Sequence, residues 1–327
     1  MLRKLATFCV CALLFIPVVA LGQQPQRTNR QAPAAQRTSQ AAREVALLRR
    51  ACNGGDMAGC FRLGAAYSRG SGVAQSATRA VEFWRRACDG GNSDACVALG
   101  LAYENGLGVE ESFTRAREYY TRALEPVRRG CDSGDMAACL RLGDAYGTSE
   151  SGVADDSLAV EFWQRACDGG NMGGCTALGQ AYAGGHGVAR SATRAVELLQ
   201  RACDSGHMDG CVALGWHYSL SSGPESRTRA FELYQRACDG GSMRGCARVA
   251  ESYANGQGVQ RNDTRAAELY QRACDGGTMW GCRMLAEMYA NGRGVQRSDA
   301  RAAELYQRAC DGGDRASCAQ LVRRSPE

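Results

Sequence analysis

The sequence predicts an all-α protein, an α/α superhelical solenoid of about seven helix-turn-helix repeats with flanking helices. Cysteine pairs with seven intervening residues recur along the chain, and their first members follow one another by 36, 43, 36, 36, 35, 36 and 36 residues. A Gly-x-Gly-Val segment and an apolar face at helical spacing recur within most of these periods. A fixed period near 36 residues is typical of stacked supersecondary units and argues against separate globular domains.

The first 22 residues have the pattern of a secretory signal peptide. Arg3 and Lys4 form a short basic region, an apolar run covers 5–21, and small residues occupy positions 20 and 22. The alternative is a membrane anchor, but the run is at the short limit for a span and contains Pro17. We therefore expect cleavage after Gly22 and no stable membrane span in the mature chain.

Residues 23–42 are predicted to form a disordered linker, so the repeat domain is expected to cover 43–327. The linker is rich in Gln, Ala, Arg, Ser and Thr and shows no apolar periodicity. Signal cleavage would remove Cys9 and Cys11, and the 18 cysteines of the chain would fall to 16, an even number. This parity agrees with disulfide pairing in an oxidising compartment, so we expect a secreted or periplasmic protein.

Each period is expected to hold two helices. Asp, Asn, Ser or Thr follows most of the first cysteines by four residues, and these residue types favour helix N-caps. The first helix then carries the second cysteine and places Leu63, Gly64 and Tyr67 on one apolar face, where the small Gly64 is expected to allow close helix approach. The second helix runs from about Thr78 to Cys88. It also holds Glu-x3-Arg pairs, whose i,i+4 spacing suits weak ion pairs on a solvated face.

The cysteine spacing favours local disulfides over metal ligation. Zinc clusters use Cys-x2–4-Cys, and the thioredoxin-like Cys-x-x-Cys does not occur in the sequence. Eight residues of continuous helix span about 12 Å, whereas a disulfide needs Cα atoms within roughly 7 Å. A Gly-Gly turn between the two helices can close this gap. The eight expected pairs are Cys52 with Cys60, Cys88 with Cys96, Cys131 with Cys139, Cys167 with Cys175, Cys203 with Cys211, Cys238 with Cys246, Cys274 with Cys282, and Cys310 with Cys318.

One period is 43 residues long because seven residues are inserted around 125–130. Seven residues correspond to about two helical turns, so the helical phase can continue through the insertion. Leu124 occupies the position where a cysteine is expected, and Pro126 is expected to kink the helix.

These spacings resemble the SEL-one-like repeat family, a relative of the tetratricopeptide repeat. The likeness covers about 43–321 and rests on Cys60-x2-Leu63-Gly64-x2-Tyr67, Gly70-x-Gly72-Val73 and Ala80-x6-Ala87-Cys88. The paired cysteines look most like those of the secreted Helicobacter cysteine-rich proteins. That resemblance implies an extracytoplasmic superhelix with one local disulfide per repeat. Members of this subfamily are described as penicillin-binding proteins or weak β-lactamases, and members of other branches as adaptors.

Residue content argues against familiar hydrolase sites. Lys4 is the single lysine, so the mature chain lacks the Ser-x-x-Lys and Lys-Thr-Gly motifs of serine β-lactamases. His186, His207 and His217 form no zinc-hydrolase motif. A net charge of +5 is too small to indicate nucleic-acid binding. We expect no metal, no cofactor and no catalytic residue. A β-lactam-binding protein or weak β-lactamase of the cell envelope is the alternative function, which the resemblance implies.

Differences between repeats concentrate on the exposed part of the first helix. By analogy with tetratricopeptide repeats, positions around the second cysteine face a concave groove. The C-terminal repeats carry large or charged residues there, namely Trp216, Arg244, Arg248, Glu251, Trp280, Arg283 and Glu287. Trp and Arg are frequent interface hot spots, and Arg also suits carboxylates. We expect the groove to bind a protein, peptide or glycan with an anionic group and an apolar element. Peptidoglycan and a β-lactam are further candidates, and ordinary surface residues are the alternative interpretation.

Overall fold

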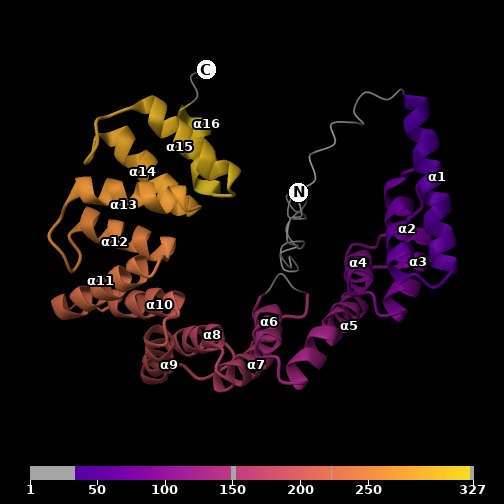
Figure 1. Cartoon of the computed structure of the whole chain (residues 1–327), viewed down its shortest axis with the longest axis horizontal. Coiled ribbons are helices and arrows are strands. Elements are labelled where there is room, and N and C mark those ends of the chain that lie inside the picture. Colours follow the sequence, from indigo (N-terminus) through magenta and orange to yellow (C-terminus); the bar gives the residue numbers. More distant parts are fainter. Residues whose placement is uncertain (1–33, 149–151, 222, 325–327) are drawn as a thin grey trace. The chain divides into compact units, whose positions relative to one another are not determined.

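The computed structural model describes residues 34–148, 152–221 and 223–324. The predicted signal peptide, 1–22, and linker residues 23–33 lie outside these ranges. Within them the chain forms sixteen helices and no strand, which confirms the all-α solenoid of repeats. The helices belong to two compact units, one ending at Asp155 and one beginning at Asp156 (Figure 1).

The N-terminal unit consists of helices that pack on their neighbours in chain order. They are α1 (Ala34–Asn53), α2 (Met57–Arg69), α3 (Ala77–Asp89), α4 (Ser93–Glu104), α5 (Phe113–Asp132) and α6 (Met136–Gly147). Helix α1 begins inside the segment 23–42 that was expected to be linker. Its first turns are rich in Ala, the best helix former, and its backbone at Ala41 closely approaches Gly72. Residues 34–42 are therefore helical.

Helix α5 absorbs the seven-residue insertion. It runs continuously over 20 residues, with Pro126 inside it, whereas α3 has 13 residues. Cys131 at its end is buried, as Cys88 is in α3. The insertion therefore lengthens the helix by about two turns and preserves its phase, as the period predicted.

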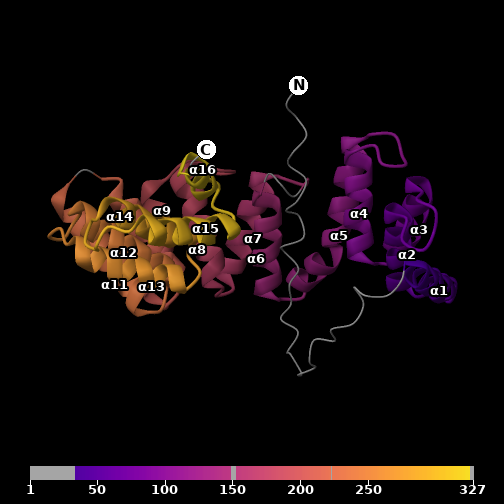
Figure 2. The same cartoon turned by 90° about the horizontal axis from the view of Figure 1, so that it is seen from above.

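The C-terminal unit continues the same alternation of helices. It contains α7 (Asp156–Asp168), α8 (Met172–Gly184), α9 (Ala192–Asp204), α10 (Met208–Ser219), α11 (Pro224–Asp239), α12 (Met243–Asn255), α13 (Asp263–Asp275), α14 (Met279–Asn291), α15 (Asp299–Asp311) and α16 (Arg315–Arg324). In Figure 1 the helices of this unit follow one another along a curve, with α8 and α10 on its inner side. Figure 2 shows the same helices from above.

A Gly-Gly or Ser-Gly turn joins the odd-numbered helix of each cysteine pair to the next helix. After α13, the Gly277 N–H donates to the Cys274 carbonyl over 3.0 Å, and the Thr278 N–H donates to the Ala273 carbonyl over 2.9 Å. This is a Schellman-type helix end, and Gly277 has the φ of 86° that it requires. The reversal brings the Cα atoms of Cys274 and Cys282 to 4.5 Å.

All eight predicted cysteine pairs are disulfides between adjacent helices, with Cα separations of 4.4–4.8 Å. In the N-terminal unit Cys52 is bonded to Cys60, Cys88 to Cys96, and Cys131 to Cys139. In the C-terminal unit Cys167 is bonded to Cys175, Cys203 to Cys211, Cys238 to Cys246, Cys274 to Cys282, and Cys310 to Cys318. The local pairing expected from the spacing is therefore confirmed at every position.

Side-chain caps fix where many helices begin. Four of the predicted caps accept a backbone N–H from the helix that follows them, namely Asn92, Asp135, Asn171 and Ser242. Asp56, His207 and Thr278 occupy the same position without such a bond from their side chains. Odd-numbered helices also begin at side-chain caps, which were not predicted. These caps are Ser76, Ser112, Ser191, Asn262 and Ser298.

Small residues let each even-numbered helix approach the odd-numbered helix that follows it. At Gly64 an added Cβ would contact the Trp84 ring and the Ala80 backbone. At Gly215 it would contact the Tyr234 ring in the same way. The close approach predicted for Gly64 is therefore confirmed, and the large side chain of the following helix fills the space that glycine leaves.

Four arginines of the predicted Glu-x3-Arg pairs make a contact that the spacing did not predict. Their guanidinium groups reach back by one repeat and donate to a cysteine carbonyl. The pairs are Arg201 with Cys167 (3.3 Å), Arg236 with Cys203 (3.1 Å), Arg272 with Cys238 (3.4 Å) and Arg308 with Cys274 (3.0 Å). The last carbonyls of a helix lack partners within it and carry its negative dipole end, so a cation there is favourable. These arginines link successive repeats.

Candidate binding site

The seven predicted groove residues lie on three even-numbered helices of the C-terminal unit. Trp216 lies on α10 and is 46% exposed. Arg244, Arg248 and Glu251 lie on α12, and Trp280, Arg283 and Glu287 lie on α14. The structure joins part of this set into one cluster and leaves Arg244 at a different place, paired with Asp209 over 3.7 Å.

Arg248 is the centre of the cluster between α12 and α14. Its guanidinium carbon lies 4.6 Å from the centroid of the Trp280 ring, close enough for a cation–π interaction. Its Nη1 lies 2.8 Å from a carboxylate oxygen of Glu251. On its other side, Trp280 packs edge-to-face on the buried Tyr270 ring, with centroids 6.0 Å apart. Arg248, Glu251 and Trp280, all predicted, therefore form one cluster. Trp280 packs this cluster against the core residue Tyr270, which was not predicted.

Arg283 and Glu287 form the second part of the cluster. Arg283 Nη1 lies 3.3 Å from Glu287 Oε1, and its Nε lies 3.1 Å from Asp314 Oδ2. Arg248 and Arg283 are therefore already bonded to carboxylates of their own chain. An anionic ligand would have to compete with these carboxylates, which weakens the expectation that these arginines recognise a carboxylate.

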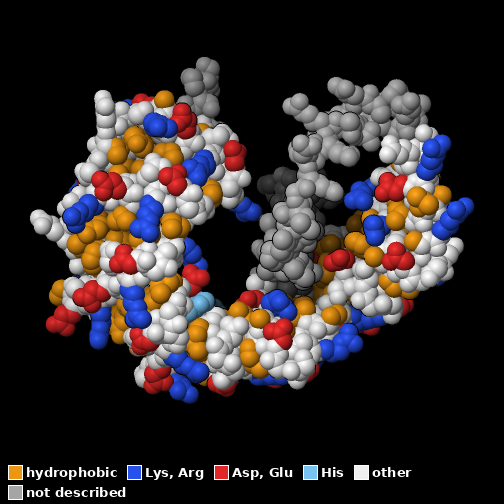
Figure 3. Space-filling model, in the orientation of Figure 1, with side chains coloured by type: hydrophobic (Ala, Val, Ile, Leu, Met, Phe, Trp, Pro, Cys, Tyr) orange, Lys and Arg blue, Asp and Glu red, His pale blue; other side chains and the backbone are white. Residues whose placement is uncertain are grey.

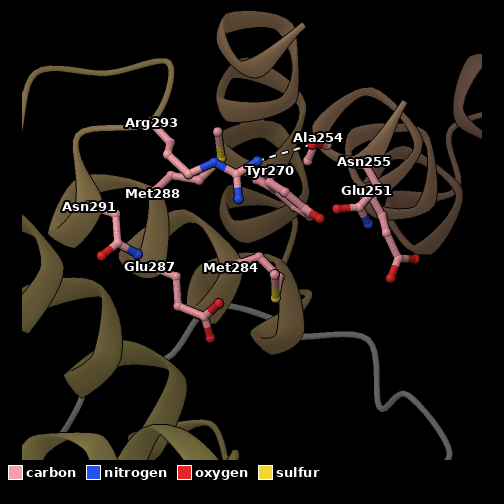
Figure 4. A pocket seen from close by; sticks show the side chains of 9 residues that line it. All are labelled: Glu251, Ala254, Asn255, Tyr270, Met284, Glu287, Met288, Asn291 and Arg293. Carbon is pink, nitrogen blue, oxygen red and sulfur yellow. Dashed lines mark hydrogen bonds between the residues drawn. The ribbon is translucent and has the colours of Figure 1, made fainter. Parts of the chain in front are cut away.

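A pocket opens beside this cluster, between α12, α13 and α14 (Figure 4). We call it the α12–α14 pocket. It is open to solvent, and its volume of about 420 Å³ includes space outside the protein surface. Its lining consists of Glu251, Ala254, Asn255, Tyr270, Met284, Glu287, Met288, Asn291 and Arg293. The Tyr270 hydroxyl points toward the α12 side chains, and Glu287 and Asn291 lie on the α14 side (Figure 4).

The Tyr270 hydroxyl has no hydrogen-bond partner among the residues that the structure describes. The tyrosine is only 1% exposed, so leaving this polar group unpaired is costly. The same position in another repeat is satisfied, because Tyr120 donates to Glu104 over 2.7 Å. In the repeat of Tyr270 the corresponding residue is Ala254, which has no polar side-chain atom.

Two carboxylates and two arginines lie close enough to this hydroxyl to affect its pKa. The pKa of Tyr270 is raised well above its ordinary value, first by burial and then by the carboxylates of Glu251 and Glu287. Arg248 and Arg293 act in the opposite direction with smaller effects. Arg293 is fixed by two hydrogen bonds. Its Nη2 donates to the Ala254 carbonyl over 3.0 Å (Figure 4) and to the Asp263 carboxylate over 2.9 Å.

Sequence reasoning missed Tyr270, Asn255 and Arg293 and their role in the pocket. A signal for Tyr270 exists at two positions that lie 16 residues apart in its repeat. The first position is four residues before the first cysteine of each pair and holds a large residue in most repeats, such as Tyr270 before Cys274. The second position follows the tyrosine of the preceding even-numbered helix, such as Ala254 after Tyr253. Glu104 can pair with Tyr120, whereas Ala254 cannot pair with Tyr270. Recognising this requires knowing that the two positions meet, which the packing of α12 on α13 establishes.

The rest of the visible surface of this unit mixes both signs of charge with apolar patches (Figure 3). Among the described residues, no group of three or more His, Cys, Asp and Glu side chains is arranged to hold a metal ion. In the described ranges, every helix is too short or too polar to cross a membrane.

Comparisons with known proteins agree with this architecture. A family model described as Sel1 repeat matches residues 58–92, 93–125, 137–171, 174–207, 209–242, 244–278 and 281–314. A solved Sel1 repeat protein from Oxalobacter formigenes is 23% identical, with a TM-score of 0.55, over 90% of this chain and 83% of that chain. Its likeness shows the fold. No curated protein sequence matches this chain significantly.

Two further solved structures are similar over smaller shares. The protein c5321, a protective antigen present in uropathogenic Escherichia coli strains, is 25% identical with a TM-score of 0.47. That match covers 86% of this chain, and this chain spans about 60% of the length of c5321. Helicobacter pylori cysteine rich protein B is 26% identical with a TM-score of 0.34, over 40% of this chain and 96% of that chain.

Proposed function

The chain belongs to the Sel1 repeat family, and from this premise we propose that it is an exported scaffold that binds a partner protein or peptide on α10, α12 and α14. Repeat solenoids present extended surfaces on which side chains vary without disturbing the stacking. Sel1 repeats generally mediate protein interactions. The proposal assigns the variable residues of the even-numbered helices to partner contact.

Export is supported by the disulfides. Eight local disulfides link adjacent helices, and their sulfurs belong to buried or nearly buried cysteines. Structural disulfides persist in secreted and periplasmic proteins and are rare where thiols are kept reduced. The signal-peptide pattern of 1–22 points to the same compartments.

The observation that carries the binding proposal is the cluster of Arg248, Glu251 and Trp280 at the edge of the α12–α14 pocket. Arg and Trp contribute much of the binding energy at interfaces when they are ordered and desolvated. Here the guanidinium is already ordered by the Trp280 ring and by Glu251. A partner that covers it would lose little side-chain entropy, because the rotamers are restrained before binding.

Photo-crosslinking in envelope extract tests the surface. A benzoylphenylalanine replaces Arg244, which is exposed on α12, and a matched variant carries it in place of Arg301 on α15. We expect the first variant to crosslink a defined envelope protein and the second to leave that protein free. Crosslinks from position 301 and none from 244 would place the interface on the odd-numbered helices and contradict the proposal.

Calorimetry with the crosslinked partner then measures the contribution of the groove residues. Replacing Trp280 and Arg283 with Ala together is expected to weaken binding by more than about 2 kcal/mol. Trp280 packs on the core, so circular dichroism and a disulfide map of the variant must match those of the unmodified chain. Unchanged affinity in a folded variant would remove these residues from the interface.

A further inference from the structure

We propose that the α12–α14 pocket receives a cationic side chain of the partner, a guanidinium or an ammonium, at Glu251, Glu287 and Tyr270. The proposal rests on the proposed function and specifies the chemistry that the surface recognises. It differs from the anionic ligand expected from the sequence, because Arg248 and Arg283 are already paired with carboxylates of their own chain.

The first argument is the unpaired hydroxyl at the buried end of the pocket. Tyr270 is 1% exposed, its hydroxyl is unpartnered within the described residues, and it lines the pocket. The equivalent Tyr120 donates its O–H to Glu104 over 2.7 Å, whereas Tyr270 meets no such side chain among the described residues. A bound N–H donor can bond to the lone pairs of the Tyr270 oxygen.

The second argument is the balance of charges around the pocket. Four carboxylates belong to the networks that border it, namely Glu251, Glu287, Asp263 and Asp314. Four arginines pair with them, namely Arg248, Arg261, Arg283 and Arg293. The pairing is uneven, because Asp263 contacts both Arg261 and Arg293, whereas Glu287 and Asp314 share Arg283. Glu287 therefore shares its cationic partner with a second carboxylate.

Glu251 and Glu287 retain acceptor capacity. The contacts with Arg248 and Arg283 each use one carboxylate oxygen, Oε2 of Glu251 and Oε1 of Glu287. A carboxylate has about four lone-pair sites, so both side chains can accept further hydrogen bonds.

The third argument is the apolar wall. Met284 and Met288 line the pocket together with Ala254. Methionine adapts its shape to the chain that packs against it, and the stems of Lys and Arg pack on apolar surface while their charged heads reach polar groups. An apolar wall leading to carboxylates fits such a side chain better than it fits a small inorganic cation.

Methionine methyl NMR tests the proposal on the intact mature chain. The protein is labelled at the methionine methyl groups, and the Met284 and Met288 signals are assigned with Met284→Leu and Met288→Leu. The probes are N-acetyl-arginine methylamide and N-acetyl-lysine methylamide, and N-acetyl-norleucine methylamide is the neutral control. We expect one or both cations to shift these two signals in a saturable manner, and norleucine to leave them in place. The two cationic probes distinguish guanidinium from ammonium.

Three variants locate the binding. Glu251→Gln and Glu287→Gln each remove one negative charge with little change of shape and are expected to weaken cation binding about tenfold. Tyr270→Phe is expected to weaken it about threefold, the loss of one neutral hydrogen bond. Glu197→Gln removes the same charge from the exposed pair with Arg194 on α9 and is expected to change nothing. If Glu197→Gln weakened cation binding as much as Glu287→Gln, the binding would be unspecific charge attraction, and the proposal would be overturned.

The outcome separates this proposal from the proposed function. Absence of a shift with both cationic probes at saturating concentration overturns the cation site, whereas crosslinking from position 244 would still support a partner surface. Shifts that occur with the probes but no crosslinked partner would support the cation site and contradict the protein-binding scaffold.

Discussion

The guanidinium of Arg308 donates a hydrogen bond to the backbone carbonyl of Cys274, 3.0 Å away and one repeat earlier in the chain. The same guanidinium lies 3.1 Å from the Asp275 carboxylate. Arg308 therefore binds the end of the preceding odd-numbered helix, next to a disulfide-bonded cysteine. Since Arg201, Arg236 and Arg272 make the same contact, it is a recurrent link between repeats.

Replacing Arg308 with Lys should destabilise the last repeats by about 1 kcal/mol, because a lysine cannot bond the carbonyl and the carboxylate in one planar fork. Urea unfolding of the unreduced protein measures the loss. The matched control is Arg301→Lys, at an exposed pair with Glu304, which should change stability by less than about 0.5 kcal/mol. Equal effects of both changes would show that the carbonyl contact contributes nothing.

Two tyrosines at the same position of different repeats should respond differently to loss of their hydroxyl. Tyr120→Phe removes a hydroxyl that donates to the Glu104 carboxylate over 2.7 Å and should cost about 1.5 kcal/mol. Tyr270→Phe removes a buried hydroxyl that lacks a partner among the described residues and should leave stability unchanged or raise it. Thermal unfolding without added ligand makes the comparison. A loss at Tyr270 as large as at Tyr120 would reveal an internal partner for its hydroxyl.

The chain that begins at Gln23 should contain eight local disulfides and no free thiol. Thiol titration of the denatured, unreduced protein should find none, and peptide mapping should recover only bridges within each Cys-x7-Cys pair. Replacing both Cys274 and Cys282 with Ala should lower stability by about 2.5 kcal/mol, from the entropy of a short closed loop. Several reactive thiols per chain, or bridges between distant pairs, would contradict this pairing.

Asp263 should make the C-terminal unit sensitive to acid. Hydrogen bonds from Arg261 and Arg293 lower the pKa of this carboxyl from 3.8 to about 2. Because the folded pKa lies below the unfolded one, the stabilisation is complete above the unfolded value and is lost as the pH falls through the folded value. The Tm difference between the native chain and Asp263→Asn should therefore be constant above about pH 5 and shrink between about pH 4 and pH 2. In an Arg293→Gln background this shrinkage should be smaller, and an unaltered pH profile there would exclude the ion pair as its cause.

Hydrolysis of nitrocefin by purified, metal-stripped protein should be absent or far below ordinary enzyme turnover of about 1–1000 per second. The motifs that serine β-lactamases use require lysine, and the chain after residue 22 contains none. Absorbance at substrate saturation measures the rate. Robust turnover that persists through stringent purification would contradict the prediction and reveal a nucleophile outside the known motifs.

The repeat period predicted the helices because the residues that end a helix, form the turn and start the next helix lie close together in the sequence. The turn after Cys274 needs only two glycines, and a disulfide across it needs only the following helix start, so both are encoded within nine residues. The start of α1 was predicted less well, since the composition of 23–42 resembles a linker. The contact of its Ala41 backbone with Gly72 comes from the next repeat region and is invisible to a local reading.

The candidate site was predicted only in part. Arg248, Glu251 and Trp280 were identified by their variation between repeats, and the structure places them in one cluster. Two of the ion pairs were readable from spacing, because Arg248 and Glu251 are an i,i+3 pair within α12 and Arg283 and Glu287 an i,i+4 pair within α14. The contact of Arg283 with Asp314, which precedes α16, and the stacking of Arg248 on Trp280 depend on packing between helices. Spacing reveals which residues share a helix face, but not which groups meet across helices.

The sequence by itself determined the period, the alternation of helices and the eight cysteine pairs, because helix caps, glycine turns and disulfide reach are properties of short segments. The tertiary structure alone decided that four of the Glu-x3-Arg arginines bond carbonyls of the preceding repeat and that the Tyr270 hydroxyl lacks a polar partner among the described residues. Both outcomes depend on which atoms of neighbouring helices come within about 3–4 Å of each other, and that distance is set by packing between helices rather than by the residues of one helix.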